Sequence, residues 1–166
     1  MTTFKIDPSR STVRMKAESS VHPIEGEAEG VEGSIQVDVT DGALSGAPTT
    51  MVLELPVEAL ESGNPLYDRE MRRRIDARKY SRITGTATSV EGQDGDYRVT
   101  GEVSFHGQTN SETNDVTMSL SGSELHVEGS HTFDIRDYGV TPPKILMLKV
   151  QPEVEVSINL YAQAQD

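Results

Sequence analysis

Residues 64–80, "NPLYDREMRRRIDARKY", hold the largest group of side chains in the chain that could bind an anion. This segment contains six of the 15 Lys and Arg residues: Arg69, Arg72, Arg73, Arg74, Arg78 and Lys79. A guanidinium group is a planar, forked donor that suits phosphates and carboxylates. The segment could therefore clamp an anionic ligand, contact nucleic acid, or form a helix that is laced by ion pairs.

No other part of the sequence carries a recognisable catalytic or metal-binding motif. The four histidines lack a metal-binding spacing, and His126 and His131, five residues apart, would face opposite sides of a strand. A nucleophile elbow, a phosphate loop and a dinucleotide fingerprint are all missing. The chain has no cysteine, which excludes disulfides and thiolate ligands. We therefore expect no catalytic residues, no metal site and no cofactor.

The arginine-rich segment predicts a helix near residues 65–77. Asn64 can accept a hydrogen bond from a free backbone N–H at the start of the helix. Tyr67, Met71 and Ile75 are four residues apart and form a narrow apolar stripe that can face a sheet. We expect this helix to lie across or beside one end of the fold.

Ion pairs within the helix account for part of the basic charge. Asp68 and Arg72, like Glu70 and Arg74, are four residues apart with the acid first, which is the more favourable order. The remaining arginines have no acid four residues before them. They are the candidates to meet the anionic head group of a ligand: Arg69, Arg73 and Arg78.

The rest of the chain is organised as alternating apolar and polar segments, which are typical of antiparallel strands with one wet face. "STVRMKAES", "GSIQVDV" and "TMVLEL" precede the helix, and "RITGTATSV", "DYRVTGEVSF", "NDVTMSL", "ELHVEGSHTFDI" and "EVEVSINLYA" follow it. "EGQDGD" predicts a hairpin turn. The fold class is therefore all-β, with eight to ten strands and one short helix. Periodicity alone leaves a sandwich and a barrel both open.

Length and charge limit the classes of partner. The 166 residues fit one domain, residues 1–166. The formal charge is 15 − 27 = −12, which opposes extended binding to nucleic acid or to anionic lipid surfaces. The first residues lack the apolar run of a signal peptide, and no later stretch is long and apolar enough for a membrane span. We expect a cytoplasmic protein without an integral membrane segment and without a nucleic-acid partner.

Four segments in order resemble the YceI-like family of lipocalin-like polyisoprenoid-binding proteins. "IDPSRSTVRM" is similar to the family's opening strand, and "VTGEVSFHGQTN" to its His-Gly hairpin. "FDIRDYGV" resembles its late Arg-x-Asp-Phe/Tyr-Gly segment. The arginine-rich helix matches the family's signature region through Asp68, Arg69, Asp76, Ala77, Tyr80 and Ile83.

The resemblance implies an antiparallel lipocalin-like β-barrel of about eight strands. It also implies a non-enzymatic carrier or store for an isoprenoid-like or long-chain acyl lipid, in a family whose members are often exported. Strand parity and the helix stripe give these candidates for the ligand pocket: Val13, Met15, Ile35, Val37, Leu53, Tyr67, Met71, Val103, Phe105, Met118, Leu120, Phe133, Val156 and Ile158. Two alternatives stay open, a small hydrolase or isomerase acting in the same cavity and a stress-related partner-binding module without a small ligand. The sequence does not determine the oligomeric state.

Overall fold

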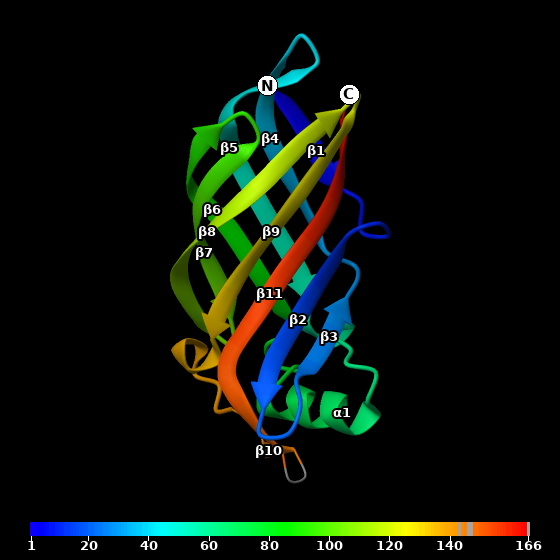
Figure 1. Ribbon diagram of the computed structural model, residues 1–166, viewed down its shortest axis with the longest axis vertical. Helices are drawn as coiled ribbons and strands as arrows, with labels where there is room; N and C mark the ends of the chain where they lie inside the picture. Colours follow the sequence, from blue (N-terminus) through cyan, green and yellow to red (C-terminus); the bar gives the residue numbers. More distant parts are fainter. Residues whose placement is uncertain (143, 146–147, 166) are drawn as a thin grey trace.

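The computed structural model of the protein describes residues 1–142, 144–145 and 148–165. Strands dominate it, and one α-helix, α1 (Pro65–Arg74), lies across one end (Figure 1). The strands are β1 (Thr2–Ile6), β2 (Thr12–Ser19), β3 (Ile24–Ala28), β4 (Glu32–Thr40), β5 (Ala43–Pro56), β6 (Arg82–Gln93), β7 (Asp96–Phe105), β8 (Gln108–Ser121), β9 (Glu124–Asp134), β10 (Lys144–Ile145) and β11 (Leu148–Ala164). Two short 3₁₀ helices, η1 (Val57–Ala59) and η2 (Ile135–Tyr138), follow β5 and β9.

The strands close into an antiparallel ring, which confirms the expected barrel. The order β1-β4-β5-β6-β7-β8-β9-β11 returns to β1, because β1 pairs with the last residues of β11. The long β11 also pairs with β2, and β3 follows β2 as an edge strand. Beyond β2, β3 has one isolated bridge, Glu27 to Glu61, near the chain that enters α1.

The turns follow the local sequence. In the predicted "EGQDGD" hairpin, Asp94 and Gly95 both have positive φ, 57° and 93°, and join β6 to β7. Two positive φ angles in a two-residue loop match the right-handed twist of the flanking strands. His106 (φ 55°) and Gly107 make the same kind of turn between β7 and β8.

The helix begins where the sequence predicts and ends three residues earlier. The Asn64 side chain accepts hydrogen bonds from the backbone N–H groups of Leu66 and Tyr67. At the other end, the Ala77 N–H donates to the Arg72 carbonyl, and Asp76 has a φ of 49°. This is a Schellman-type ending with aspartate in the position that glycine usually takes.

Among the residues that the structure describes, no helix is long and apolar enough to cross a membrane.

Candidate functional site

An apolar cavity of about 300 Å³ lies in the half of the barrel that α1 covers. Met71 of α1 and Ile75, the residue that caps its C-terminus, close it at the helix end. Its walls are inward-facing side chains of seven strands: Val13, Met15 and Ala17 of β2, Ile24 of β3, Leu53 and Leu55 of β5, Ile83 of β6, Val103 and Phe105 of β7, Phe133 of β9, and Val150, Val154, Val156 and Ile158 of β11. Such a cavity offers an aliphatic chain dispersion contacts and removal from water.

The other half of the barrel is filled. Ile35, Val37, Leu125, Val127 and Leu160 are 0% exposed and pack in one core cluster. The backbone ladder between β5 and β6 ends at Val52 and Thr86, so these two strands are not paired in this half. The buried side chain of Tyr97 occupies this region, and its hydroxyl donates to the Gly46 carbonyl at 3.4 Å. Among the described residues, the apolar cavity in the barrel interior therefore lies in the half next to α1.

A glycine in β6 contributes to the empty volume. Gly85 borders the cavity and pairs with Leu53 on one side and Val103 on the other. A Cβ atom added there would meet nothing within 4 Å. The missing side chain at Gly85 therefore leaves open space where the neighbouring strands present Leu and Val.

The structure brings nine of the fourteen predicted pocket residues to the cavity. These are Val13, Met15, Leu53, Met71, Val103, Phe105, Phe133, Val156 and Ile158. Four others, Ile35, Val37, Met118 and Leu120, belong to the core cluster but do not border the cavity. Tyr67 lies instead beside His22 of the β2–β3 turn, with ring centroids 6.4 Å apart. Strand parity found which side chains face inward, but not where the interior is empty.

The inner face of α1 includes a buried carboxylate, Asp68, which does not form the expected ion pair with Arg72. Asp68 is 9% exposed and borders the cavity, and it accepts hydrogen bonds from the Ser62 N–H at 2.9 Å and the Ser62 hydroxyl at 2.7 Å. A buried carboxylate requires such donors. Arg72, which we expected to pair with Asp68, donates instead to the Glu58 carbonyl at 3.4 Å. The loop before the helix thus satisfies Asp68.

The arginines of α1 share one acid. Glu70 accepts from Arg74 at 3.3 Å, as expected, and also from Arg73 at 2.8 Å. The hydrogen bond from Arg73 is the main reason why the pKa of Glu70 is lowered. Arg73 is therefore paired, contrary to expectation, whereas Arg69 and Arg78 form no ion pair among the described residues.

None of the three predicted head-group arginines borders the cavity. Arg69, Arg73 and Arg78 are all exposed to solvent. Among the six basic residues of the segment, only Arg74 contributes to the cavity wall. An anionic group bound inside the cavity would therefore meet Arg74 before it met the other three.

A polar trio stands in the barrel wall where β8 and β9 separate. The ladder between these strands ends at Val116 and Gly129. Beyond that point, the two oxygens of Glu112 bridge His131 and Tyr138: Oε2 lies 2.7 Å from His131 Nε2, and Oε1 accepts from the Tyr138 hydroxyl at 3.0 Å. Burial, and then the bond to the Glu112 carboxylate, raise the pKa of Tyr138. Side-chain hydrogen bonds thus replace the missing backbone ladder.

Tyr138 connects the trio to the cavity. Tyr138 is buried and borders the cavity together with Phe133, whose ring meets the His131 ring edge-on at 4.6 Å between centroids. His106 also supports this region, since its Nδ1 lies 3.0 Å from the Tyr138 carbonyl oxygen. Sequence reasoning missed Glu112 and Tyr138. The available signal was parity, which places Glu112 on the same face of β8 as the buried Val116 and Met118.

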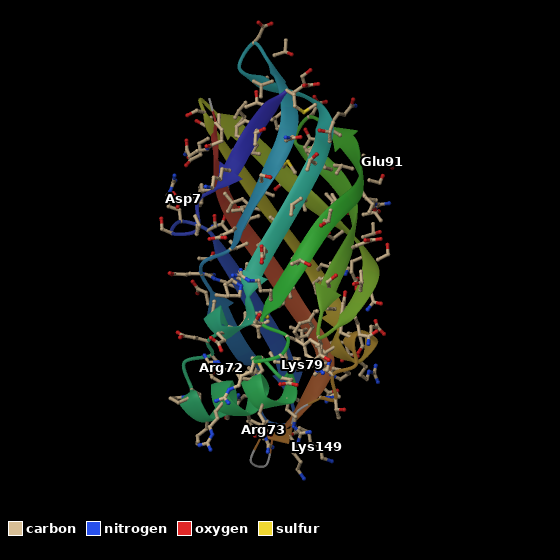
Figure 2. The ribbon with its side chains drawn as sticks, turned by 180° about the vertical axis from the view of Figure 1, so that it is seen from behind. Asp7, Arg72, Arg73, Lys79, Glu91 and Lys149 are labelled. Carbon is tan, nitrogen blue, oxygen red and sulfur yellow. The ribbon has the colours of Figure 1, made fainter. Side chains whose placement is uncertain are left out.

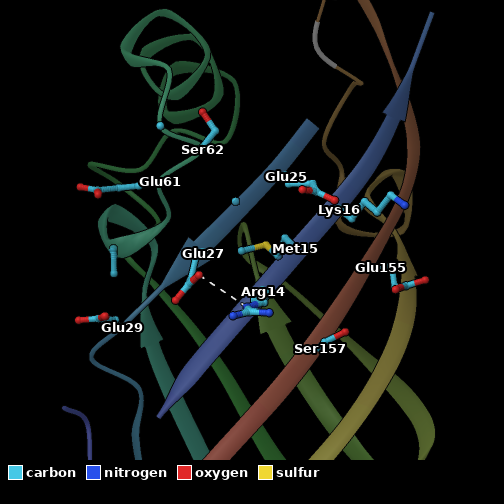
Figure 3. Close-up of a pocket in the computed structure, with 13 residues that line it drawn as sticks. Arg14, Met15, Lys16, Glu25, Glu27, Glu29, Glu61, Ser62, Glu155 and Ser157 are labelled. Atoms are coloured by element: carbon cyan, nitrogen blue, oxygen red, sulfur yellow. Dashed lines mark ion pairs between the residues drawn. The ribbon is translucent and has the colours of Figure 1, made fainter. Parts of the chain in front are cut away.

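A polar groove runs along the outer flank of β2 and β3 (Figure 3). Its acidic side chains come from β3, from the loops around it and from β11: Glu25, Glu27, Glu29, Glu61 and Glu155. Arg14 is paired with Glu27 at 3.6 Å. Met15, Gly26 and Ser62 border both the groove and the cavity, so the two spaces meet between the free edge of β3 and the chain entering α1.

Across residues 1–142, 144–145 and 148–165, no three His, Asp or Glu side chains are grouped in a way that could hold a metal ion.

Comparison with known proteins identifies the domain type. The YceI-like domain matches residues 4–162. No curated protein matches the sequence.

Solved structures with the same fold share little sequence with this chain. Burkholderia cenocepacia BcnA is 19% identical, with a TM-score of 0.81 over 95% of this chain and 99% of that protein. A polyisoprenoid binding domain from Saccharophagus degradans, implicated in plant cell wall breakdown, is 16% identical, with a TM-score of 0.78 over 98% of both chains. The Campylobacter jejuni YCEI protein is 14% identical, with a TM-score of 0.71 over 86% of both chains.

Proposed function

Because the chain belongs to the YceI-like domain family, we propose that it is a binding protein rather than an enzyme, and that an isoprenoid-like or acyl chain occupies the cavity beneath α1. The observation that carries the proposal is the apolar cavity itself. The protein of the same fold from Saccharophagus degradans is a polyisoprenoid binding domain, which favours an isoprenoid chain as the ligand. The domain that we propose for this role spans residues 1–166, and its cytoplasmic location stays a prediction.

The volume of the cavity sets the length of chain that it holds. A methylene group is about as large as a water molecule, whose share of liquid volume is about 30 Å³. A cavity of about 300 Å³ therefore holds on the order of ten chain carbons. A longer chain would leave its remainder outside the barrel or displace side chains of the filled half.

The same count limits the affinity. Ten buried carbons contribute about 8 kcal/mol at about 0.8 kcal/mol each, equivalent to a dissociation constant of about 1 μM. The loss of translational and rotational freedom on association reduces this gain. Binding much tighter than micromolar would require contacts to the head group.

The polar trio is the feature that a small cavity enzyme would use. Both Glu112 oxygens are engaged, by His131 and by Tyr138, and only Tyr138 of the three borders the cavity. These features favour a structural role for the trio and a non-enzymatic function for the cavity.

A chain-length series tests the proposed function. Unlabelled n-alkanoic acids of increasing length should displace dansyl-labelled undecanoate, with affinity rising for each carbon until the cavity is full and then reaching a plateau. Native mass spectrometry of gently purified protein, followed by lipid extraction, should show a bound chain. Lipid binding would be refuted if the purified protein carried no lipid and if no alkanoic acid of any length displaced the probe.

The head-group prediction for the exposed arginines needs a separate comparison. Geraniol and geranyl phosphate present the same chain with a neutral and an anionic end. If Arg69 and Arg73 contact the head group, changing both to Ala should weaken binding of the phosphate and leave binding of the alcohol unchanged. Equal affinities in the parent and the double variant for both ligands would remove these arginines from the ligand site.

A further inference from the structure

We propose that the end of the barrel covered by α1 is a docking surface for anionic membranes. We define the cationic pole as residues 64–80 together with Lys144 and Lys149. This surface would bring the cavity next to a bilayer from which a lipid chain can enter. The proposal adds a membrane partner to the proposed lipid function. The role that we give to docking rests on that function, whereas membrane binding itself does not.

The charge of the molecule is strongly divided between the pole and the remainder. Residues 64–80 carry six basic and three acidic residues, a net +3, and the two lysines raise the pole to +5. The remainder of the chain therefore carries −12 − 5 = −17. The overall acidity, which by itself opposes binding to anionic lipid, does not describe this end of the molecule.

The two parts of the pole are neighbours in the structure. Arg72, Arg73, Lys79 and Lys149 gather at the end that holds α1, whereas Asp7 and Glu91 lie farther along the barrel (Figure 2). Two hydrogen bonds at the β2–β3 turn fix this arrangement: the Ser20 N–H donates to the Lys149 carbonyl, and the Lys149 N–H donates to the Ser20 hydroxyl. Lys149 also pairs across the hairpin with Lys144. Like charges directly opposite are unfavourable in a hairpin unless an anion offsets their repulsion.

Exposed apolar side chains accompany the basic ones. Val21 of the β2–β3 turn is 71% exposed and Leu66 of α1 is 58% exposed. The contact between His22 and Tyr67 places the segments that carry them side by side. Basic side chains around a few protruding apolar ones are the combination that binds the interface of an anionic membrane.

The acidic side chains at the far turns orient the protein without preventing contact at the pole. Electrostatic interactions at physiological ionic strength fade over about 8 Å, whereas β5 alone, with 14 residues, spans about 46 Å. The acids at the far turns are thus too distant to repel a bilayer at the pole. The flank with the acidic groove would be repelled, so we expect the barrel to dock end-on.

Flotation with vesicles tests the docking surface. The parent should bind vesicles of mixed phosphatidylglycerol and phosphatidylcholine, bind pure phosphatidylcholine vesicles far more weakly, and dissociate as salt is raised. Each basic side chain near an anionic surface strengthens binding by about fivefold. Changing Arg69, Arg73 and Lys149 to Gln should therefore weaken binding to the mixed vesicles on the order of 100-fold.

A matched control separates the pole from net charge. Changing Lys5, Arg14 and Arg98 to Gln lowers the total charge by the same three units, on exposed positions of β1, β2 and β7. This control should bind vesicles almost as the parent does. For the apolar part, Leu66→Gln should weaken binding several-fold, whereas Val52→Gln on β5 should not.

Three results would overturn the proposal. The first is equal binding of the parent to mixed and to neutral vesicles. The second is an equal loss of binding in the pole variant and its control, with both variants melting as the parent does. The third is binding to heparin without binding to vesicles, which would assign the pole to another polyanion. Displacement of dansyl-labelled undecanoate in solution tests the cavity independently, because vesicle flotation does not require a filled cavity.

Discussion

Replacing Gly85 with Leu should close much of the cavity without harming the fold. Gly85 lies on β6 between two strands that present cavity-lining side chains, and its missing Cβ points into open space. Its φ is not among the positive values, so the backbone there suits any L-residue. A leucine at this position should therefore project into the cavity from an undistorted strand.

The size of the effect follows from volume. A leucine side chain has four carbons, which at about 30 Å³ each occupy about 120 Å³. That is about two fifths of the cavity of about 300 Å³, and it displaces about four carbons of a bound chain. At about 0.8 kcal/mol per carbon the loss is about 3 kcal/mol, or about 200-fold in the dissociation constant.

The stability of the protein should move in the opposite direction. Burying the new side chain in an apolar space contributes about 1.5 kcal/mol or more to the free energy of unfolding. Removing a glycine also lowers the entropy of the unfolded chain, which adds about 0.4–1 kcal/mol. Gly85→Leu should therefore melt at the same temperature as the parent or higher.

Displacement titrations and urea unfolding measure the two effects. The matched control is Thr86→Leu, which adds an apolar side chain to the next position of β6, on the outer, exposed face. That control should bind dansyl-labelled undecanoate as the parent does. If Gly85→Leu binds the probe with unchanged affinity while remaining folded, then the chain does not occupy this cavity and the reasoning fails.

Three further predictions concern stability. Asp76→Gly should raise the free energy of unfolding by about 1 kcal/mol, because a residue with φ of 49° is strained unless it is glycine; a lower thermal midpoint would contradict this. Tyr138→Phe should lower the free energy of unfolding in urea by about 1 kcal/mol, because one Glu112 oxygen loses its hydrogen-bond donor. An unchanged urea midpoint would show that water replaces the hydroxyl. Hydrogen bonds from Arg136 hold the pKa of Asp134 below its ordinary value, so the carboxylate contributes stability above about pH 4 that is lost as pH falls through the lower folded pKa. Asp134→Asn should thus be less stable than the parent at neutral pH, and the two midpoints should converge in acid; a constant difference across the titration would contradict the assignment.

Much of the barrel could be predicted from short-range pattern. The alternation in "GSIQVDV" specified the inward residues Ile35 and Val37, both of which are fully buried. Successive side chains of a strand point to opposite faces, so this information is local. For the same reason, Asn64 identified the start of the helix and "EGQDGD" a hairpin.

Which parts of the interior are filled depended on strands that are far apart in the sequence. Ile35 and Val13 have the same pattern and belong to the same core cluster, yet only Val13 borders the cavity. The difference arises because a layer of a barrel is completed by side chains from several strands, at heights that their register sets. A glycine at residue 85 signals empty space only after Leu53 and Val103 are known to flank it.

By itself, therefore, the sequence determined the strand class, the inward faces, the start of the helix and, through its motifs, the family. Only the tertiary structure decided where the cavity lies, that Ser62 rather than Arg72 satisfies Asp68, and that Glu112 joins His131 to Tyr138. It also decided that an acidic chain has one cationic end, since Lys149 and the helix are about 70 residues apart in the sequence and meet only in space. Local conformation follows from neighbouring residues, whereas empty volume, hydrogen-bond partners and electric field depend on which distant residues the closed sheet brings together.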